Sequence, residues 1–221
     1  MLDIVTYSYV IFPLIFLLLR GKFKDRFLLV LALYGLTFFS LIFFDGLIPL
    51  NIKKYYQAFY TFLEYSFFTY LIWLHIRNDK FKKFIIAVSI LFIIFQFFFV
   101  SSTALKRIDS IPIGIETILI FIFIFFYFFE FSKNTREIFI YNHYSFWVAV
   151  GIMIYLGGSF FFYILANHLD RDEANKLITM TWVAEIIKNL LFVLSIFLYK
   201  KHPKNNLEKL KDIPNLDMNM I

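Results

Sequence analysis

Residues 83–101 read KFIIAVSILFIIFQFFFVS, an apolar stretch whose one charged residue, Lys83, stands at its start. A run of this length suits an α-helix that crosses a bilayer, because the hydrocarbon core takes about 20 apolar residues to span. Its apolar residues are continuous and do not alternate with polar ones over about ten positions, as they would in a transmembrane barrel strand. The stretch therefore predicts a membrane-spanning helix.

Six further apolar runs follow the same pattern, each bounded by charged residues or by Pro, Asn and Asp. We predict an all-α polytopic membrane protein, with a bundle of seven transmembrane helices forming one domain over residues 1–200. The predicted helices lie at about 3–19, 26–44, 56–76, 83–101, 111–131, 144–166 and 177–199. The first is short and contains Pro13, which predicts a kink. Residues 201–221 are predicted to form a basic and polar cytoplasmic tail.

The composition agrees with a membrane protein. Hydrophobic residues make up 61% of the 221 residues, and the mean hydropathy is +0.73, above what a soluble domain shows. The chain contains no cysteine, which excludes disulfides, thiol catalysis and cysteine-based zinc sites. The net charge of +6 is interpreted as the basic bias of cytoplasmic loops and not as a nucleic-acid-binding surface.

The distribution of Lys and Arg predicts the orientation. The segments after the first, third, fifth and seventh predicted helices carry 15 of these residues, whereas the segments on the opposite side carry six. Basic residues accumulate in cytoplasmic loops. We therefore predict that the N-terminus is outside and the C-terminus inside, in the inner (cytoplasmic) membrane of a bacterium.

Ionisable side chains interrupt three of the predicted helices. Glu64, Glu116, Glu185 and Lys188 lie within apolar runs, where each charge costs about 3 kcal/mol or more and generally faces the bundle interior. Glu185 and Lys188 are spaced to pair directly, and Asn189 shares their helix face. We predict a polar core with hydrogen bonds from two other helices, formed by Glu64, Glu116, Glu185, Lys188, Asn189, Tyr155 and Gln96.

Three interpretations of this polar core remain open: hydrogen bonding between helices alone, a ligand or ion pocket, or a chain of proton-transfer groups. Glu64 also shares its helix face with Gln57 and His75. Because His75 lies near the predicted cytoplasmic interface, we interpret it as an interfacial residue that reaches toward the headgroups.

The sequence offers little support for catalysis. Its four histidines lie at helix ends or in loops, without metal-ligand spacing. We predict no catalytic residues, no metal site and no cofactor. A retinal protein, with a Schiff base on Lys188 and Glu64 as counterion, is disfavoured because Ala184 stands where such proteins place a carboxylate.

Four stretches resemble uncharacterised seven-helix integral membrane proteins common in Bacteroidota. They are residues 60–65 (YTFLEY), 115–117 (IET), 146–157 (FWVAVGIMIYLG) and 185–192 (EIIKNLLF). In that family the last helix carries repeated asparagines; here Asn189 matches one of them and Glu185 replaces another. Members are often encoded near sensor histidine kinases or response regulators, so the resemblance implies a sensory or regulatory role.

We therefore expect a non-enzymatic membrane module that senses or relays a signal. It would contact the lipid bilayer and act through a protein partner, such as a kinase or another cytoplasmic protein, and not through nucleic acid. The alternative is a pore or transporter, including the membrane effector of a defence system. A pore should form a homo-oligomer or open a water-filled path lined by Glu64 and Glu116.

Overall fold

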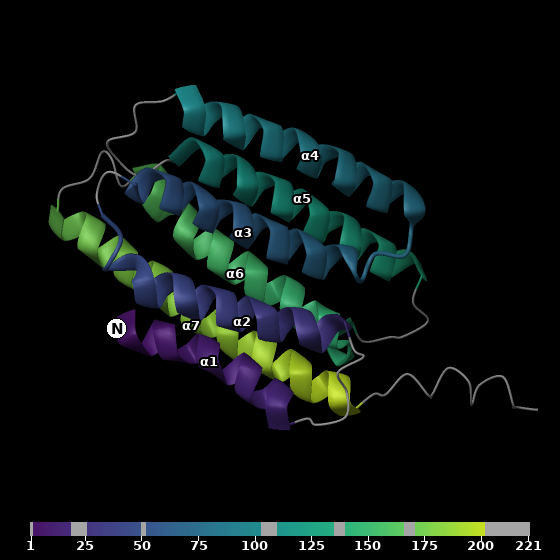
Figure 1. The fold of residues 1–221 in the computed structure, drawn as a ribbon. Coiled ribbons are helices and arrows are strands. Elements are labelled where there is room, and N and C mark those ends of the chain that lie inside the picture. The colour runs from purple at the N-terminus through teal and green to yellow at the C-terminus, as the bar shows by residue number, and fades with distance from the viewer. Residues whose placement is uncertain are drawn as a thin grey trace, which may run out of the picture.

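The computed structural model describes residues 2–18, 26–49, 52–102, 110–134, 140–165 and 171–201. Over this part of the chain the secondary structure is helical, with no strands (Figure 1). The all-α prediction is confirmed, and each predicted run contains one helix. The helices are α1 (Leu2–Leu18), α2 (Arg26–Asp45), α3 (Lys53–Trp73), α4 (Asp79–Ser102), α5 (Ser110–Asn134), the short 3-10 helix η1 (Ile140–Asn142), α6 (Tyr144–Leu165) and α7 (Arg171–Lys201).

Some helix bounds differ from the predicted ones. α3 begins at Lys53 and ends at Trp73, so that His75 lies beyond the helix. α7 begins at Arg171 and not near residue 177, because its first turns are polar and hydropathy alone does not include them. α1 remains helical through Pro13. The predicted tail, residues 201–221, lies beyond the described residues except for Lys201.

Consecutive α-helices run in opposite directions (Figure 1). We call the end where α1, α3, α5 and α7 begin the N-terminal end of the bundle, and the other end its C-terminal end. α1 packs on α2 and α7, α6 packs on α5 and α7, and α3 packs on α4 and α5. α4 lies at the edge of the bundle and buries the side chains of Ile85, Phe92 and Gln96.

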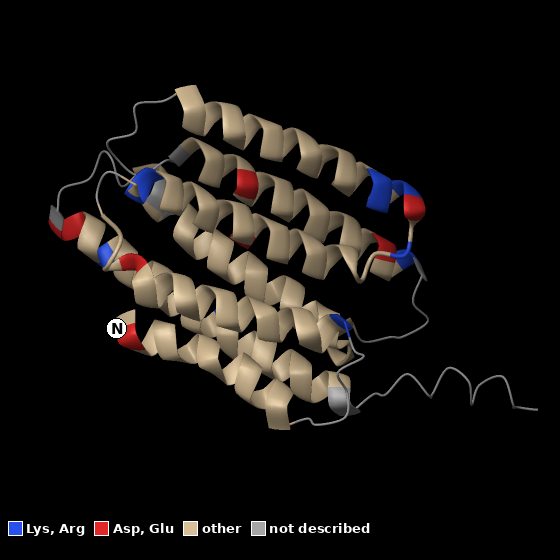
Figure 2. Ribbon diagram, in the orientation of Figure 1, with Lys and Arg blue, Asp and Glu red and all other residues tan. Residues whose placement is uncertain are grey.

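Four helices, α2, α4, α5 and α7, are long and apolar enough to cross a membrane, and α1 and α6 supply shorter apolar helices. Many large apolar side chains on their outer surfaces are exposed, among them Leu91, Phe97 and Phe125. Most charged residues of the described helices lie near the two ends of the bundle (Figure 2). An apolar outer belt between charged ends is what a bilayer requires.

Glycines set the closest helix contacts. A Cβ atom at Gly35 of α2 would lie 2.5 Å from the backbone carbonyl oxygen of Tyr9 in α1. Pro13 has no N–H to donate to that carbonyl, so the carbonyl faces Gly35 without its usual helical partner. Between α6 and α7, a Cβ atom at Gly158 would lie 2.7 Å from the Cβ of Ala184. Small residues thus allow these helix pairs to approach closely.

Candidate functional site

Lys188 of α7 is the most deeply buried charge in the described structure, with none of its surface exposed. Its Nζ donates a hydrogen bond to the hydroxyl of Tyr9, at 3.1 Å, and lies 4.0 Å from the centre of the Tyr155 ring. The rings of Tyr34 and Phe68 complete an aromatic enclosure around it. Cation–π contacts of this kind partly replace the hydration of a buried ammonium group.

The hydroxyl of Tyr9 links Lys188 to Glu185. It donates a hydrogen bond to Oε1 of Glu185 while it accepts one from Lys188. The direct pairing of Glu185 with Lys188 predicted from their spacing is therefore wrong, because no ion pair joins them in the structure and the Tyr9 side chain bonds to both. One turn away, Asn189 Nδ2 donates to Ser8 Oγ at 2.6 Å. α1 and α7 are thus joined through polar side chains.

Tyr9 and Ser8 are not among the residues predicted for the polar core. Both lie in α1, whose apolar run contains no charged residue after Asp3. In the sequence, only their neutral hydroxyl groups distinguish them from the apolar residues around them. A tyrosine in a transmembrane run also suits the membrane interface. Only the packing of α1 on α7 shows that both side chains belong to the polar core.

Two other predicted core residues, Glu64 of α3 and Glu116 of α5, are 6% and 1% exposed. Neither oxygen of Glu116 has a hydrogen-bond partner, and Oε1 of Glu64 has none. Glu64 interacts electrostatically with Lys188 and Glu185, and Glu116 interacts with Glu64. The structure therefore brings all four predicted ionisable residues into one electrostatically linked group.

Tyr155 supplies a hydrogen bond to this group as predicted, from its side chain to Glu64, whereas Gln96 bonds to the helix backbone. Gln96 Nε2 donates to the carbonyl oxygen of Ala58 at 2.8 Å, and its Oε1 has no partner. Tyr155 presents its ring to the ammonium group of Lys188. The amide of Gln96 thus joins α4 to the backbone of α3.

Two adjoining cavities lead from this group of residues toward the N-terminal end of the bundle. The first, which we call the Glu64 cavity, has a volume of about 330 Å³ and reaches from Lys53 and Gln57 to Glu64 and Gln96. The second, the Glu185 cavity, has a volume of about 200 Å³ and ends at Glu185. Both are lined by Tyr56, Tyr60 and Phe162, among other shared residues. Cavities of this size with a few buried polar groups are typical of ligand sites.

Beyond the two cavities, large apolar side chains fill the middle of the bundle. Phe68 and Leu71 of α3, Ile120 and Phe123 of α5, and Ile152 of α6 are fully buried and belong to one hydrophobic core. We call these five residues the apolar barrier. Along α3 it occupies the ten residues between Glu64 and His75, about 15 Å of helix. The described residues at this level therefore separate the two ends of the bundle.

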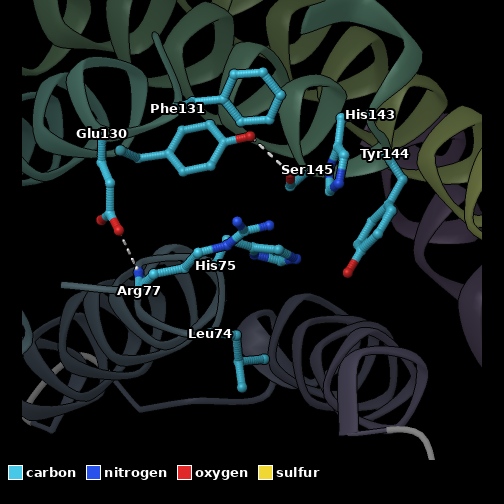
Figure 3. Close-up of a pocket in the computed structure, with 9 residues that line it drawn as sticks. Leu74, His75, Arg77, Glu130, Phe131, His143, Tyr144 and Ser145 are labelled. Atoms are coloured by element: carbon cyan, nitrogen blue, oxygen red, sulfur yellow. Dashed lines mark hydrogen bonds between the residues drawn. The ribbon is translucent and has the colours of Figure 1, made fainter. Parts of the chain in front are cut away.

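A smaller pocket of about 160 Å³ lies at the C-terminal end, where α3 and α5 end and α6 begins. His75 and Arg77 lie in its centre, with Glu130 on one side and Tyr144 on the other (Figure 3). The backbone N–H of Arg77 donates to Glu130 Oε1 at 2.9 Å, while Glu130 Oε2 has no partner. We call it the histidine pocket.

His75 does not extend toward the headgroups as predicted. Its Nδ1 donates to the carbonyl oxygen of Leu71 at 2.7 Å, and its ring packs against those of Phe27, Tyr127 and Tyr144. Burial lowers the pKa of His75, which lies in the segment between α3 and α4, to about 4, although the bond to Leu71 acts in the opposite direction. The face predicted to hold Gln57, Glu64 and His75 is thus divided between two pockets.

Within the described residues, no group of three His, Asp or Glu side chains is placed to hold a metal ion. The fold and the site define a helical membrane protein with a buried, charged polar core next to a cavity. No protein family, curated protein or solved structure matches the chain.

Proposed function

We propose that this protein is a seven-span sensory or signal-relay module, with its N-terminus outside and its C-terminus in the cytoplasm of a bacterium. A ligand in the cavities at the N-terminal end would be the signal, and a protein partner at the C-terminal end would receive it. The resemblance of four stretches to Bacteroidota proteins encoded near sensor kinases supports the same proposal. No catalytic step is assigned to the module.

One observation carries this proposal: α7 connects the cavity to the opposite end of the bundle. Glu185 lines the Glu185 cavity, and the helix that bears it continues without a break to Lys201. At the same level Glu185 and Lys188 are bonded to Tyr9 of α1. A ligand that competes for these bonds would favour a different packing of α7 against α1, which is how differential binding shifts a conformational equilibrium.

A protein partner at the C-terminal end is the second part of the proposal. The segments between the described helices are short, so the output of a shift in α7 has to be read by another molecule. A kinase or another cytoplasmic regulator that contacts the C-terminal end would meet this need.

Purification from native membranes in a mild detergent tests the proposal. We expect tagged protein to bring down a cytoplasmic regulator in a fixed ratio, measured by mass spectrometry and by the mass of the eluted complex. A tagged helical membrane protein of similar size, expressed at the same level, is the control. A homo-oligomer without a partner would contradict the relay.

A transporter is the second candidate function, and the apolar barrier supports it. A cavity that ends at a mid-bundle carboxylate and is closed toward the opposite end also suits one state of an alternating-access cycle. In that case purified protein in liposomes would move a solute, and Glu64→Gln would disturb the flux. Liposomes that hold the protein and show no flux of organic or inorganic cations would contradict the transporter.

A further inference from the structure

The buried groups at the bottom of the Glu64 cavity are hydrogen-bond acceptors. Glu64 Oε1 and Gln96 Oε1 have no partner, and these side chains are 6% and 5% exposed. The Nε2 group of Gln96 is already used on the carbonyl of Ala58. Because an unsatisfied buried acceptor is costly, a ligand that complements this wall has to donate hydrogen bonds.

Lys53 and Lys54 line the outer rim of the cavity, where Lys53 pairs with Asp45 at 3.3 Å. The buried charges at its inner end call for a positive ligand. In the N-terminal half of the described bundle, three buried carboxyl groups, Glu64, Glu116 and Glu185, accompany one buried ammonium group, Lys188. That ammonium group is held by Tyr9 and by the ring of Tyr155. A second cation next to Glu64 would reduce the excess of acidic groups, which a low-dielectric interior makes expensive.

The remaining walls suit an organic cation better than a metal ion. Tyr56, Tyr60 and Phe162 supply aromatic surface to the Glu64 cavity, and Ile113 and Ile178 supply aliphatic surface. Metal ions such as Ca²⁺ need six or more oxygen ligands, whereas the described residues hold no cluster of three acidic or histidine side chains. Aromatic walls next to a carboxylate are well suited to an ammonium group with an apolar body.

We propose that the Glu64 cavity binds a primary amine with an apolar body. The ammonium group lies on Glu64 and Gln96, and the body lies between the aromatic walls toward Gln57 at the exposed end. This assignment rests on the proposed sensory function, for which it names the class of signal. A soluble amine and a lipid with an amine headgroup share this chemistry.

Binding of simple probes to purified full-length protein in phosphatidylcholine nanodiscs tests the assignment by calorimetry. We expect 2-phenylethylamine to bind, and the neutral 2-phenylethanol and the anionic 3-phenylpropionate to bind at least about tenfold more weakly. Glu64→Gln should weaken amine binding by about 10- to 100-fold. Glu130→Gln, which changes the buried glutamate of the histidine pocket, is the matched control and should bind the amine normally.

A second variant keeps the test independent of how well Glu64→Gln folds. Val100→Phe fills part of the Glu64 cavity and leaves the carboxylate in place, so it should also abolish amine binding while the protein keeps its thermal midpoint. Equal binding of the amine and the alcohol, or normal amine binding by either variant, would overturn the assignment. So would saturation of the site by Na⁺ or K⁺ alone.

Nanodiscs that also contain phosphatidylethanolamine distinguish the two sources of amine. Competition by this lipid assigns the site to a headgroup, whereas unchanged binding of 2-phenylethylamine assigns it to a soluble amine. The relay itself is tested by capture of a partner, so a captured regulator together with failed amine binding would overturn only the ligand class. Amine binding without capture of any partner would support the amine site and overturn the relay.

Discussion

Lys188 has exchanged the water around its ammonium group for one hydroxyl and several aromatic rings. The free energy lost when a charge leaves water is larger than the free energy that one hydrogen bond supplies. Each remaining partner of Lys188 therefore contributes strongly to stability. Tyr9 is the partner with the most to contribute, because its hydroxyl bonds to Glu185 as well. The stability of the polar core should therefore depend strongly on one oxygen atom.

Tyr9→Phe removes that oxygen and leaves the ring in place. We expect it to lower the free energy of unfolding by about 1–3 kcal/mol, because Lys188 and Glu185 each lose a buried partner. The measurement is thermal unfolding of purified protein in nanodiscs. Tyr7→Phe, the same change on the same helix at a side chain that is 68% exposed, should have no effect. Equal stability of Tyr9→Phe and the parent protein would mean that the lysine and the glutamate interact without the hydroxyl.

His75 predicts a pH dependence of stability. Its pKa is about 4 in the folded protein and near 6.5 when unfolded. Between these values the unfolded state binds more protons, so stability should fall as the pH falls from 6.5 to 4, by roughly 2 to 4 kcal/mol in total. The contribution of this group is constant above pH 6.5 and below pH 4.

His75→Phe isolates this contribution, because the ring already packs among Phe27, Tyr127 and Tyr144. Unfolding midpoints measured from pH 7.5 to 4 should decline less steeply in the variant than in the parent protein. Parallel declines would assign the pH dependence to groups other than His75.

At this scale the sequence was informative about one side of the polar core. Periodicity and the cost of burying charge predicted Glu185, Lys188 and Asn189 on one face of the last helix, and the structure places them there. Their partners Tyr9 and Ser8 were not predictable in the same way, because an uncharged hydroxyl carries little cost in an apolar run. Which helix packs next to α7 is information that hydropathy does not contain.

Among the helices, close packing depends on two glycines that face backbone or a rigid methyl group. Gly35→Ala would place a Cβ atom 2.5 Å from the carbonyl oxygen of Tyr9, so α1 and α2 would have to separate. We expect a loss of roughly 1–3 kcal/mol, measured as a lower unfolding midpoint. Gly114→Ala is the control, since its Cβ atom would meet nothing within 4 Å; it should be neutral or slightly stabilising. A tolerated Gly35→Ala would show that α1 does not lie this close to α2.

The helices themselves were largely predictable, because each apolar run is long and ends in charged or helix-breaking residues. Their ends were predicted less well wherever polar turns extend a helix beyond its apolar part, as in the first turns of α7. The cavities were not predictable at all. They are lined by side chains of several helices, among them Phe162 and Tyr60, which look like ordinary apolar residues in the sequence.

For the molecule as a whole, the charge bias predicts an orientation in the membrane that can be measured directly. The chain contains no cysteine, so single cysteines report their own positions. Gly46→Cys, in the turn after α2, should react with a membrane-impermeant maleimide in intact cells. Asn78→Cys, between α3 and α4, should react only after permeabilisation. The reverse pattern would overturn the predicted orientation.

A cysteine in the apolar barrier extends this experiment to the interior. Ile120→Cys replaces a fully buried side chain and should stay unmodified from both sides. Rapid modification by a small charged thiol reagent would mean that water passes the barrier, which would favour a pore over a relay.

The bonds that join α1 to α7 also have a consequence for how the protein is made. Tyr9 leaves the ribosome 176 residues before Glu185, its hydrogen-bond partner, which at about 5–20 residues per second corresponds to a delay on the order of ten to forty seconds. During that interval the hydroxyls of Ser8 and Tyr9 reside in the bilayer without the partners they will have in the finished protein. Because α2 follows α1 in the chain, the two helices can pack at Gly35 before α7 is made. The hydroxyls of Ser8 and Tyr9 would then belong to this helical pair until α7 arrives.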